Sequence, residues 1–214
     1  MSESTVRNLI SGIAAIAELL GDDYEPVEHG RVILPFTVMR RLDCVLEPTK
    51  DRVLEAASQL SGSSKNRGQL LEGAAGHPYY NTSPYTFTSL LSDPENLATS
   101  LQKYIAEFSA PVREVLTHFS VDAHMRRLVA NDLLYPLMSR FRALDLRRGM
   151  VSDQEMGSIY EGSSWGSVST RTTIERRSDN PIDLLMPSEQ CLRVLNHFDR
   201  YVSSAYSQPP QFGF

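Results

Sequence analysis

The stretch that decides the fold is VILPFTVMRRLDCVLEP, residues 32–48 of a 214-residue chain. Its apolar side chains recur near helical spacing and form a broad stripe: Val32, Ile33, Leu34, Phe36, Val38, Met39, Leu42, Val45 and Leu46. Charges at Arg40 and Arg41 interrupt the stripe, so the segment is too short and too charged to cross a bilayer. We predict a core-facing helix that is kinked at Pro35 and ends at Pro48.

The same helix gives two further predictions, one about the pairing of its charges and one about which of its faces is buried. Arg40 or Arg41 is expected to pair with the nearby acids Asp43 or Glu47. Leu42 lies on the apolar stripe and should be buried, whereas Glu47 should be exposed.

Capping residues and apolar spacing predict further helices on both sides. They are a first helix ending at Leu20, residues 50–60, residues 70–75, a helix starting at Asp93-Pro94-Glu95, one starting at Ser109 and Pro111, residues 122–130, and the LLYPLMSRF segment at 133–141. A proline-rich and aromatic segment at 78–87 is expected to be extended. Strand signals are almost absent before residue 161, so the predicted class is all-α, an irregular multi-helix domain.

The overall charge argues against a protein that holds nucleic acid unaided. The chain has 21 Lys and Arg against 26 Asp and Glu, a net charge of -5, whereas nucleic-acid-binding domains usually show a basic face. DNA contact is therefore shared with a partner or absent. Two cysteines, Cys44 and Cys191, make no disulfide framework, and Cys44 in the apolar helix is expected to be a buried free thiol. These features favour a reducing cytoplasm, and no signal peptide is expected in the apolar residues 9–20.

Three segments carry a resemblance to a known family. They are RVILPFTVMRRLDCVLEPTKDRV at 31–53, HPYYNTSPYTF at 77–87 and VSDQEMGSIYE at 151–161. The chain resembles the N-terminal helical domain of the modification (DNA methyltransferase) subunit of type I restriction-modification systems, over roughly residues 7–161. The resemblance implies a helical domain in a complex with specificity and restriction subunits, which reaches DNA within the assembly. The intact family methylates adenine N6 with S-adenosylmethionine.

The resemblance stops after Glu161. Residues 162–173 read GSSWGSVSTRTT, without helical period, where the family continues a helix and then an F-T-P-R segment near the cofactor. The codons that Trp165 and the following residues allow also permit the family text in a frame offset by two bases. We therefore divide the chain into a helical domain at 1–161 and a frameshifted, poorly structured tail at 162–214. A natural, divergent tail is the alternative.

Motifs for methyl transfer are missing from the sequence. Such enzymes need a glycine-rich strand-turn-helix for S-adenosylmethionine and an Asn/Asp-Pro-Pro-aromatic segment for the flipped base. Residues 180–183, Asn-Pro-Ile-Asp, share only Asn-Pro with that motif. The five histidines have no metal-ligand spacing, and no nucleophile elbow occurs. We therefore predict no catalytic, cofactor-binding or metal-binding residues on this chain, and no activity of the chain alone.

Four residues are candidate contacts with a partner or DNA. Tyr79 and Tyr80 could stack on bases, although such clusters more often belong to a core or interface. Arg126 and Arg127 could contact phosphate or a partner.

These observations leave two main hypotheses. The first is the N-terminal part of a type I modification subunit, contributing subunit and DNA contacts without the catalytic domain. The second is a stand-alone, non-catalytic helical module that binds a specificity subunit or DNA. A complete small enzyme of another class is the weakest alternative, because no convergent catalytic site is visible.

Overall fold

The structure, a computed structural model, describes residues 3–60, 66–147 and 149–151, all within one compact unit of the chain. The predicted tail at 162–214, the expected capping box at Ser152 and Glu155, and Cys191 lie outside the described residues. Among the described residues, no helix combines the length and apolar character needed to cross a membrane.

The described residues confirm the all-α class. Their helices are α1 (Glu3–Leu20), α2 (Pro26–Leu46), α3 (Lys50–Gln59), α4 (Arg67–Ala75), α5 (Phe87–Leu90), α6 (Leu97–Ala106), α7 (Ala110–His118), α8 (Val121–Ala130) and α9 (Leu134–Ala143). Short 3-10 helices at Gly21–Asp23 and Glu47–Thr49 flank α2. The described part of the chain contains no strand, and one isolated antiparallel bridge joins Asn81 to Phe108.

The central helix is α2, as the sequence predicts, but it is buried more completely than a stripe would require. Residues 32–39 are all buried, so this part of α2 is surrounded by protein on every side. The helix begins at Pro26, where proline costs no hydrogen bond, and it continues through Pro35 before ending ahead of Pro48. The buried Thr37 hydroxyl donates to the carbonyl of Ile33 at 2.9 Å, so this polar group is satisfied within the helix.

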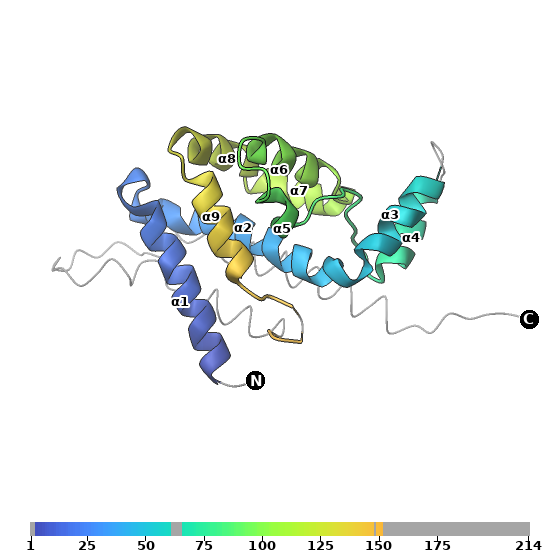
Figure 1. The fold of residues 1–214 in the computed structure, drawn as a ribbon, viewed down its shortest axis with the longest axis horizontal. Coiled ribbons are helices and arrows are strands. Elements are labelled where there is room, and N and C mark those ends of the chain that lie inside the picture. Colours follow the sequence, from blue (N-terminus) through green and yellow to red (C-terminus); the bar gives the residue numbers. More distant parts are fainter. Residues whose placement is uncertain (1–2, 61–65, 148, 152–214) are drawn as a thin grey trace, which may run out of the picture. The chain divides into compact units, whose positions relative to one another are not determined.

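Several helices cover α2. Helices α1, α8 and α9 pack on it, and α1 also packs on α9. Figure 1 shows α9 beside α1, with α2 crossing both. Gly12 makes the approach of α1 possible, because a Cβ atom there would lie 2.5 Å from the Cδ2 atom of Leu144, just after α9. Farther along the chain, α3 packs against α4 as a helical hairpin, and α6, α7 and α9 contact α8 in turn.

Local signals predicted most helix ends to within a few residues, with one correction. Gly76 closes α4 in the left-handed conformation at a φ of 67°. The predicted helix start at Asp93-Pro94-Glu95 is wrong, because α6 begins only at Leu97. Asp93 still acts as a cap: its carboxylate accepts from the backbone N–H of Asn96 at 3.4 Å and from its side-chain amide at 2.9 Å. The proline and glutamate form a turn that leads into the helix.

Candidate functional site

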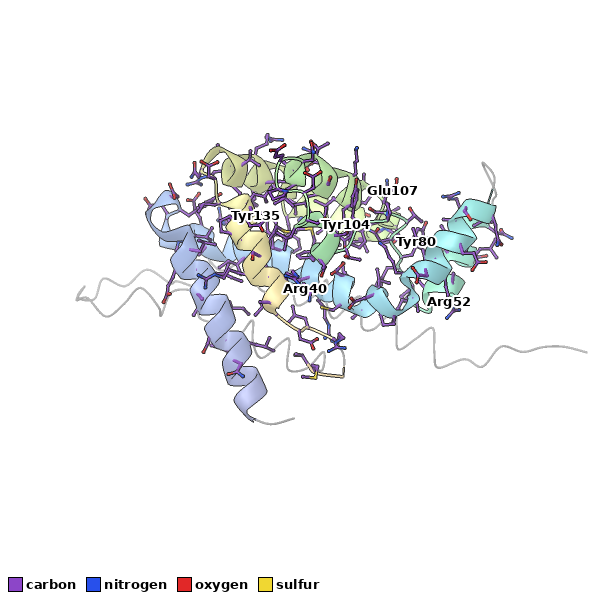
Figure 2. The ribbon with its side chains drawn as sticks, viewed as in Figure 1. Arg40, Arg52, Tyr80, Tyr104, Glu107 and Tyr135 are labelled. Atoms are coloured by element: carbon purple, nitrogen blue, oxygen red, sulfur yellow. The ribbon has the colours of Figure 1, made fainter. Side chains whose placement is uncertain are left out.

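The resemblance-bearing RRLD residues meet in a buried polar network centred on Asp43, which is 7% exposed. Arg40 Nη1 donates to the Asp43 carboxylate at 2.8 Å, which confirms the predicted pairing on α2. The Tyr104 hydroxyl from α6 donates to Asp43 at 3.2 Å, and the backbone N–H of Phe87 donates at 3.3 Å. Figure 2 shows Arg40 and Tyr104 near each other in the interior. Asp43 therefore joins α2, α5 and α6.

The environment of Asp43 opposes ionisation even though its partners favour the charge. Removal from water raises the pKa of the Asp43 carboxyl, while the Arg40 charge and the donors from Phe87 and Tyr104 lower it. Burial and the neighbouring Asp43 charge hold the pKa of the Tyr104 hydroxyl well above its ordinary value. Tyr104 is therefore a hydrogen-bond donor to Asp43 at physiological pH.

Arg40 also holds the carboxyl end of α9. Its Nη2 atom donates to the carbonyl of Arg142 at 3.1 Å, and its Nε atom donates to the carbonyl of Leu144 at 3.0 Å. The last carbonyls of a helix have no intrahelical partner and carry partial negative charge, so a guanidinium there is favourable. One side chain thus fixes both Asp43 and the end of α9.

Arg41 ties down the segment that follows α9. Its side chain is 6% exposed and donates to the carbonyl of Val151 at 2.8 Å and to that of Leu146. Both acceptors lie more than 100 residues away along the chain. The arginine pair therefore holds the end of α9 and the carbonyls of Leu146 and Val151 against α2.

The YNTS segment supplies the second half of the network. Asn81 is 3% exposed, and its Nδ2 atom donates to the carbonyl of Tyr104 at 2.9 Å. Its Oδ1 atom accepts from the backbone N–H of Ser83 at 2.9 Å and from Lys50 Nζ at 3.2 Å. Lys50 also lies over the Tyr104 ring, 5.6 Å from its centroid, and burial lowers the pKa of its amine to about 8. Asn81 and Lys50 thereby join α3, the YNTS segment and α6.

The chemistry of this network is structural. Its charged groups face one another and backbone carbonyls, an arrangement that satisfies buried polar atoms. No cluster of three or more His, Cys, Asp or Glu able to hold a metal occurs among the described residues. Cys44 is the expected buried free thiol, and burial raises its pKa, which keeps it protonated and unreactive.

The structure separates the two candidate tyrosines. Tyr79 is 4% exposed and stacks on the His77 ring at 5.4 Å between centroids. Tyr80 is half-buried, and its carbonyl accepts from the backbone N–H of Ser109 at 3.0 Å. Figure 2 shows Tyr80 close to Glu107, whose carbonyl accepts from the backbone N–H of Thr82, two residues further along the segment, at 3.0 Å. Of the two tyrosines, only Tyr80 is partly exposed.

The structure also separates the two candidate arginines. Arg127 from α8 donates to Glu28 Oε1 at 2.9 Å and to the carbonyl of Asp23 at 2.6 Å, and it lies over the Tyr24 ring at 4.0 Å. The hydrogen bond from Arg127 lowers the pKa of the Glu28 carboxyl. Arg127 therefore holds the start of α2 against α8. Arg126 is exposed and makes no ion pair with any residue that the structure describes.

The family model described as the HsdM N-terminal domain matches residues 9–141. The chain belongs to this family. Comparisons with curated proteins and with solved structures returned no match.

The HsdM N-terminal domain is the N-terminal domain of a type I modification subunit, which confirms the resemblance read from the sequence. The matched range runs from α1 to Phe141 in α9, so the donors and acceptors around Asp43 and Asn81 lie inside it. The acceptors Leu144, Leu146 and Val151 lie just beyond the matched range.

Sequence reasoning missed how these polar residues act together. Lys50, Asn81 and Tyr104 were given no role, although Asn81 stands in the resemblance-bearing segment. The available signal was polar side chains among apolar neighbours, which predicts burial with partners but does not name the partners.

Proposed function

We propose that this chain acts as the protein-docking part of a type I modification subunit. It binds a specificity subunit first and binds DNA firmly only within the assembled complex, whereas the isolated chain binds DNA weakly and in a salt-sensitive way. Membership of the HsdM N-terminal domain family supports the complex. The observation that carries the order of binding is the charge: residues 1–161 hold 16 Lys and Arg against 21 Asp and Glu. A surface of this sign gains little from counterion release on DNA.

The buried network supports the same order of binding. Arginine side chains such as Arg40 and Arg41 can bind phosphate. Here both donate hydrogen bonds inside the domain, to Asp43 and to backbone carbonyls. These two arginines of the resemblance-bearing segment therefore hold the domain together. Partner binding must use other residues.

The docking surface in this proposal includes Tyr80 in the HPYYNTSPYTF segment. The segment is anchored at Asn81 and Thr82, so Tyr80 is held in a fixed position rather than on a loose loop. A rigid aromatic side chain loses little entropy on binding and is typical of interface centres.

A pull-down with a cognate specificity subunit tests the proposal. The intact chain should be retained, and Tyr80→Ala should reduce retention by at least about tenfold, the loss typical of a central aromatic contact. Tyr135→Ala on α9 is the matched control, because this tyrosine is 44% exposed on another helix. Retention that is absent for the intact chain, or equally reduced by both changes, would contradict the proposal.

The isolated chain should neither bind S-adenosylmethionine nor methylate DNA. The reason is the sequence, which has neither the glycine-rich turn nor the Asn-Pro-Pro-aromatic segment that such chemistry needs. Calorimetric titration with S-adenosylmethionine should give no heat of binding. Specific binding at micromolar concentration would overturn this part of the proposal.

The alternative is a stand-alone interaction module that binds a specificity subunit without any methyltransferase partner. The DNA that follows the coding region separates the two, because a continuing methyltransferase reading frame favours the first. The proposed division at residue 161 belongs to the same question. Limited proteolysis should leave a fragment ending near residue 160, and a tail as protected as that fragment would refute the division.

A further inference from the structure

One outward surface of the domain has a charge pattern unlike the rest. Among the described helices, α9 is the only one with two or more arginines and no acidic residue, because it reads LYPLMSRFRA. Residues 134–151 hold four arginines and one aspartate in a chain with a net charge of -5. Positive charge is therefore concentrated at the end of the matched domain and in the residues that follow it.

The side chains of α9 sort cleanly between inside and outside. Leu134, Leu137, Met138 and Phe141 are buried. Tyr135, Ser139, Arg140 and Arg142 are exposed, and Tyr135 is 44% exposed. The spacings from 135 to 139 and from 139 to 142 place three of these on one face of the helix. Arg140 lies about 160° around the helix from Arg142, at the other edge of the exposed surface. We call these four residues the α9 outer face.

The two arginines of the α9 outer face differ from the other arginines near them. Arg147 is paired with Asp145 at 2.5 Å, Arg127 with Glu28 at 2.9 Å, and Arg40 with Asp43 at 2.8 Å. Arg140 and Arg142 make no ion pair with any residue in the described part of the chain. Both guanidinium groups are therefore available to an external anion.

The position of α9 is fixed by the buried network. Arg40 donates to the carbonyl of Arg142, so the backbone that carries the Arg142 side chain is held to α2. Figure 1 shows α9 with no other described helix drawn in front of it in that view, which agrees with its exposed residues. A prepositioned helix presents its charged groups with less entropy loss than a loop does.

We propose that the α9 outer face contacts the phosphate backbone of duplex DNA, with Arg140 and Arg142 as phosphate ligands and Tyr135 and Ser139 as additional hydroxyl donors. This inference rests on the proposed function and names the surface that reaches DNA within the assembly. Arginine, tyrosine and serine are typical donors to phosphate oxygens and carry no sequence information there. The face from 135 to 142 is about 10 Å long, which matches about three phosphates of one strand.

The test is DNA binding by the full chain, measured by fluorescence anisotropy with two unrelated duplexes at low salt, about 50 mM. The Arg140→Gln, Arg142→Gln double variant should bind both duplexes about tenfold more weakly. Its salt dependence should fall by about two units of slope, close to 0.9 for each lost phosphate contact. Equal effects on the two duplexes are expected, because a backbone contact does not read sequence.

The matched control is the Arg52→Gln, Lys103→Gln double variant. It removes the same charge from exposed positions on α3 and α6, and it should weaken binding by less than about twofold. Equal weakening by the two double variants would mean that only net charge matters, and would overturn the inference. So would intact chain that fails to bind either duplex at low salt.

The same variants are tested in the pull-down with the specificity subunit. The α9 variant should be retained like the intact chain, so a loss of DNA binding with retained subunit binding supports the inference. A loss of subunit binding with unchanged DNA binding would make the α9 outer face a protein-docking surface and overturn it. Failure of the intact chain in the pull-down, with α9-dependent DNA binding, would instead refute the proposed function alone.

Discussion

Two pairs of arginines in this domain lie in opposite environments. Arg40 and Arg41 on α2 lie mostly inside, where they bind Asp43 and the carbonyls of residues far along the chain. Arg140 and Arg142 on α9 lie outside without an ion pair among the described residues. Residue type alone would give all four the same role.

The difference shows how charge is used in a domain of this size. A buried charge is tolerated only when it is paired and hydrogen-bonded, so Arg40 and Arg41 are committed to architecture. An exposed arginine in water contributes little to stability and is therefore free for binding. Breaking one pair should affect folding, and breaking the other should affect only association.

The largest expected effect comes from removing the shared acceptor of the inner pair. Asp43→Ala leaves Arg40, the Tyr104 hydroxyl and the N–H of Phe87 without their common partner. The free energy of unfolding should fall by about 3–5 kcal/mol, as when one member of a buried pair is lost. Denaturation of the intact chain and of Asp43→Ala with guanidinium chloride measures this difference in the free energy of unfolding.

The outer arginines provide the control for Asp43→Ala. Arg140→Ala and Arg142→Ala should each change the free energy of unfolding by no more than about 0.5 kcal/mol, since both side chains are exposed. Loss of stability from these changes that equals the loss from Asp43→Ala would remove the distinction between inner and outer arginines.

A slightly smaller effect is expected from the apolar lining beside the inner pair. Leu42 is 7% exposed, as predicted, so Leu42→Ala should cost about 2–5 kcal/mol through lost burial and the cavity left behind. Glu47 is exposed, and Glu47→Ala should change stability by no more than about 0.5 kcal/mol. Denaturant midpoints that shift equally for both would mean that the inward face of α2 is misassigned.

Two helical glycines sharpen the contrast between packed and open positions. Gly12→Ala should destabilise by about 1 kcal/mol, because its Cβ atom would meet Leu144 and the overpacking outweighs the gain in helix propensity. Gly73→Ala on α4 should stabilise by about 0.5–1 kcal/mol, since its Cβ atom would meet nothing within 4 Å. Thermal unfolding of the two variants should shift in opposite directions, and shifts of the same sign would refute the close α1 packing.

A pH dependence of stability is also expected at Lys50. Burial lowers the pKa of Lys50 from 10.5 to about 8 in the folded chain. Between these values the unfolded chain binds more protons, so stability should rise with pH from about 8 to 10.5 as the cost of burying the charge disappears.

Lys50→Met should lack this rise in stability, and Lys103→Met, at an exposed position on α6, should keep it. Denaturant midpoints at pH about 7 and about 9.5 provide the measurement. A rise with pH that is the same for intact chain and Lys50→Met would show that other groups cause it.

Most of the helices could be predicted because their signals are local. Pro26 marks the start of α2, Gly76 the end of α4, and Ser109 precedes α7. Asp93 shows the limit of such signals, because it caps a turn instead of the first turn of α6. A capping residue fixes hydrogen bonds over three residues, and it does not decide whether those residues are a turn or a helix.

Of the four contact residues predicted, the structure leaves two open to a partner. Tyr79 is buried against His77, and Arg127 is engaged by Glu28 and Tyr24. Tyr80 and Arg126 keep exposed surface. Two adjacent residues of the same type have the same capacity to bind a partner as far as the sequence shows. Only their neighbours in the folded structure distinguish them.

The sequence by itself determined the helical class, the central place of residues 32–48 and the family, because periodicity, capping and motif text are properties of neighbouring residues. Only the tertiary structure decided which polar groups form hydrogen bonds inside the domain and which are exposed on its surface. Arg41 reaches a carbonyl 110 residues away, and Asn81 reaches Tyr104 across 23 residues. Such pairings depend on where distant segments meet after packing, and burial then makes each unpaired polar group costly enough to fix its partner.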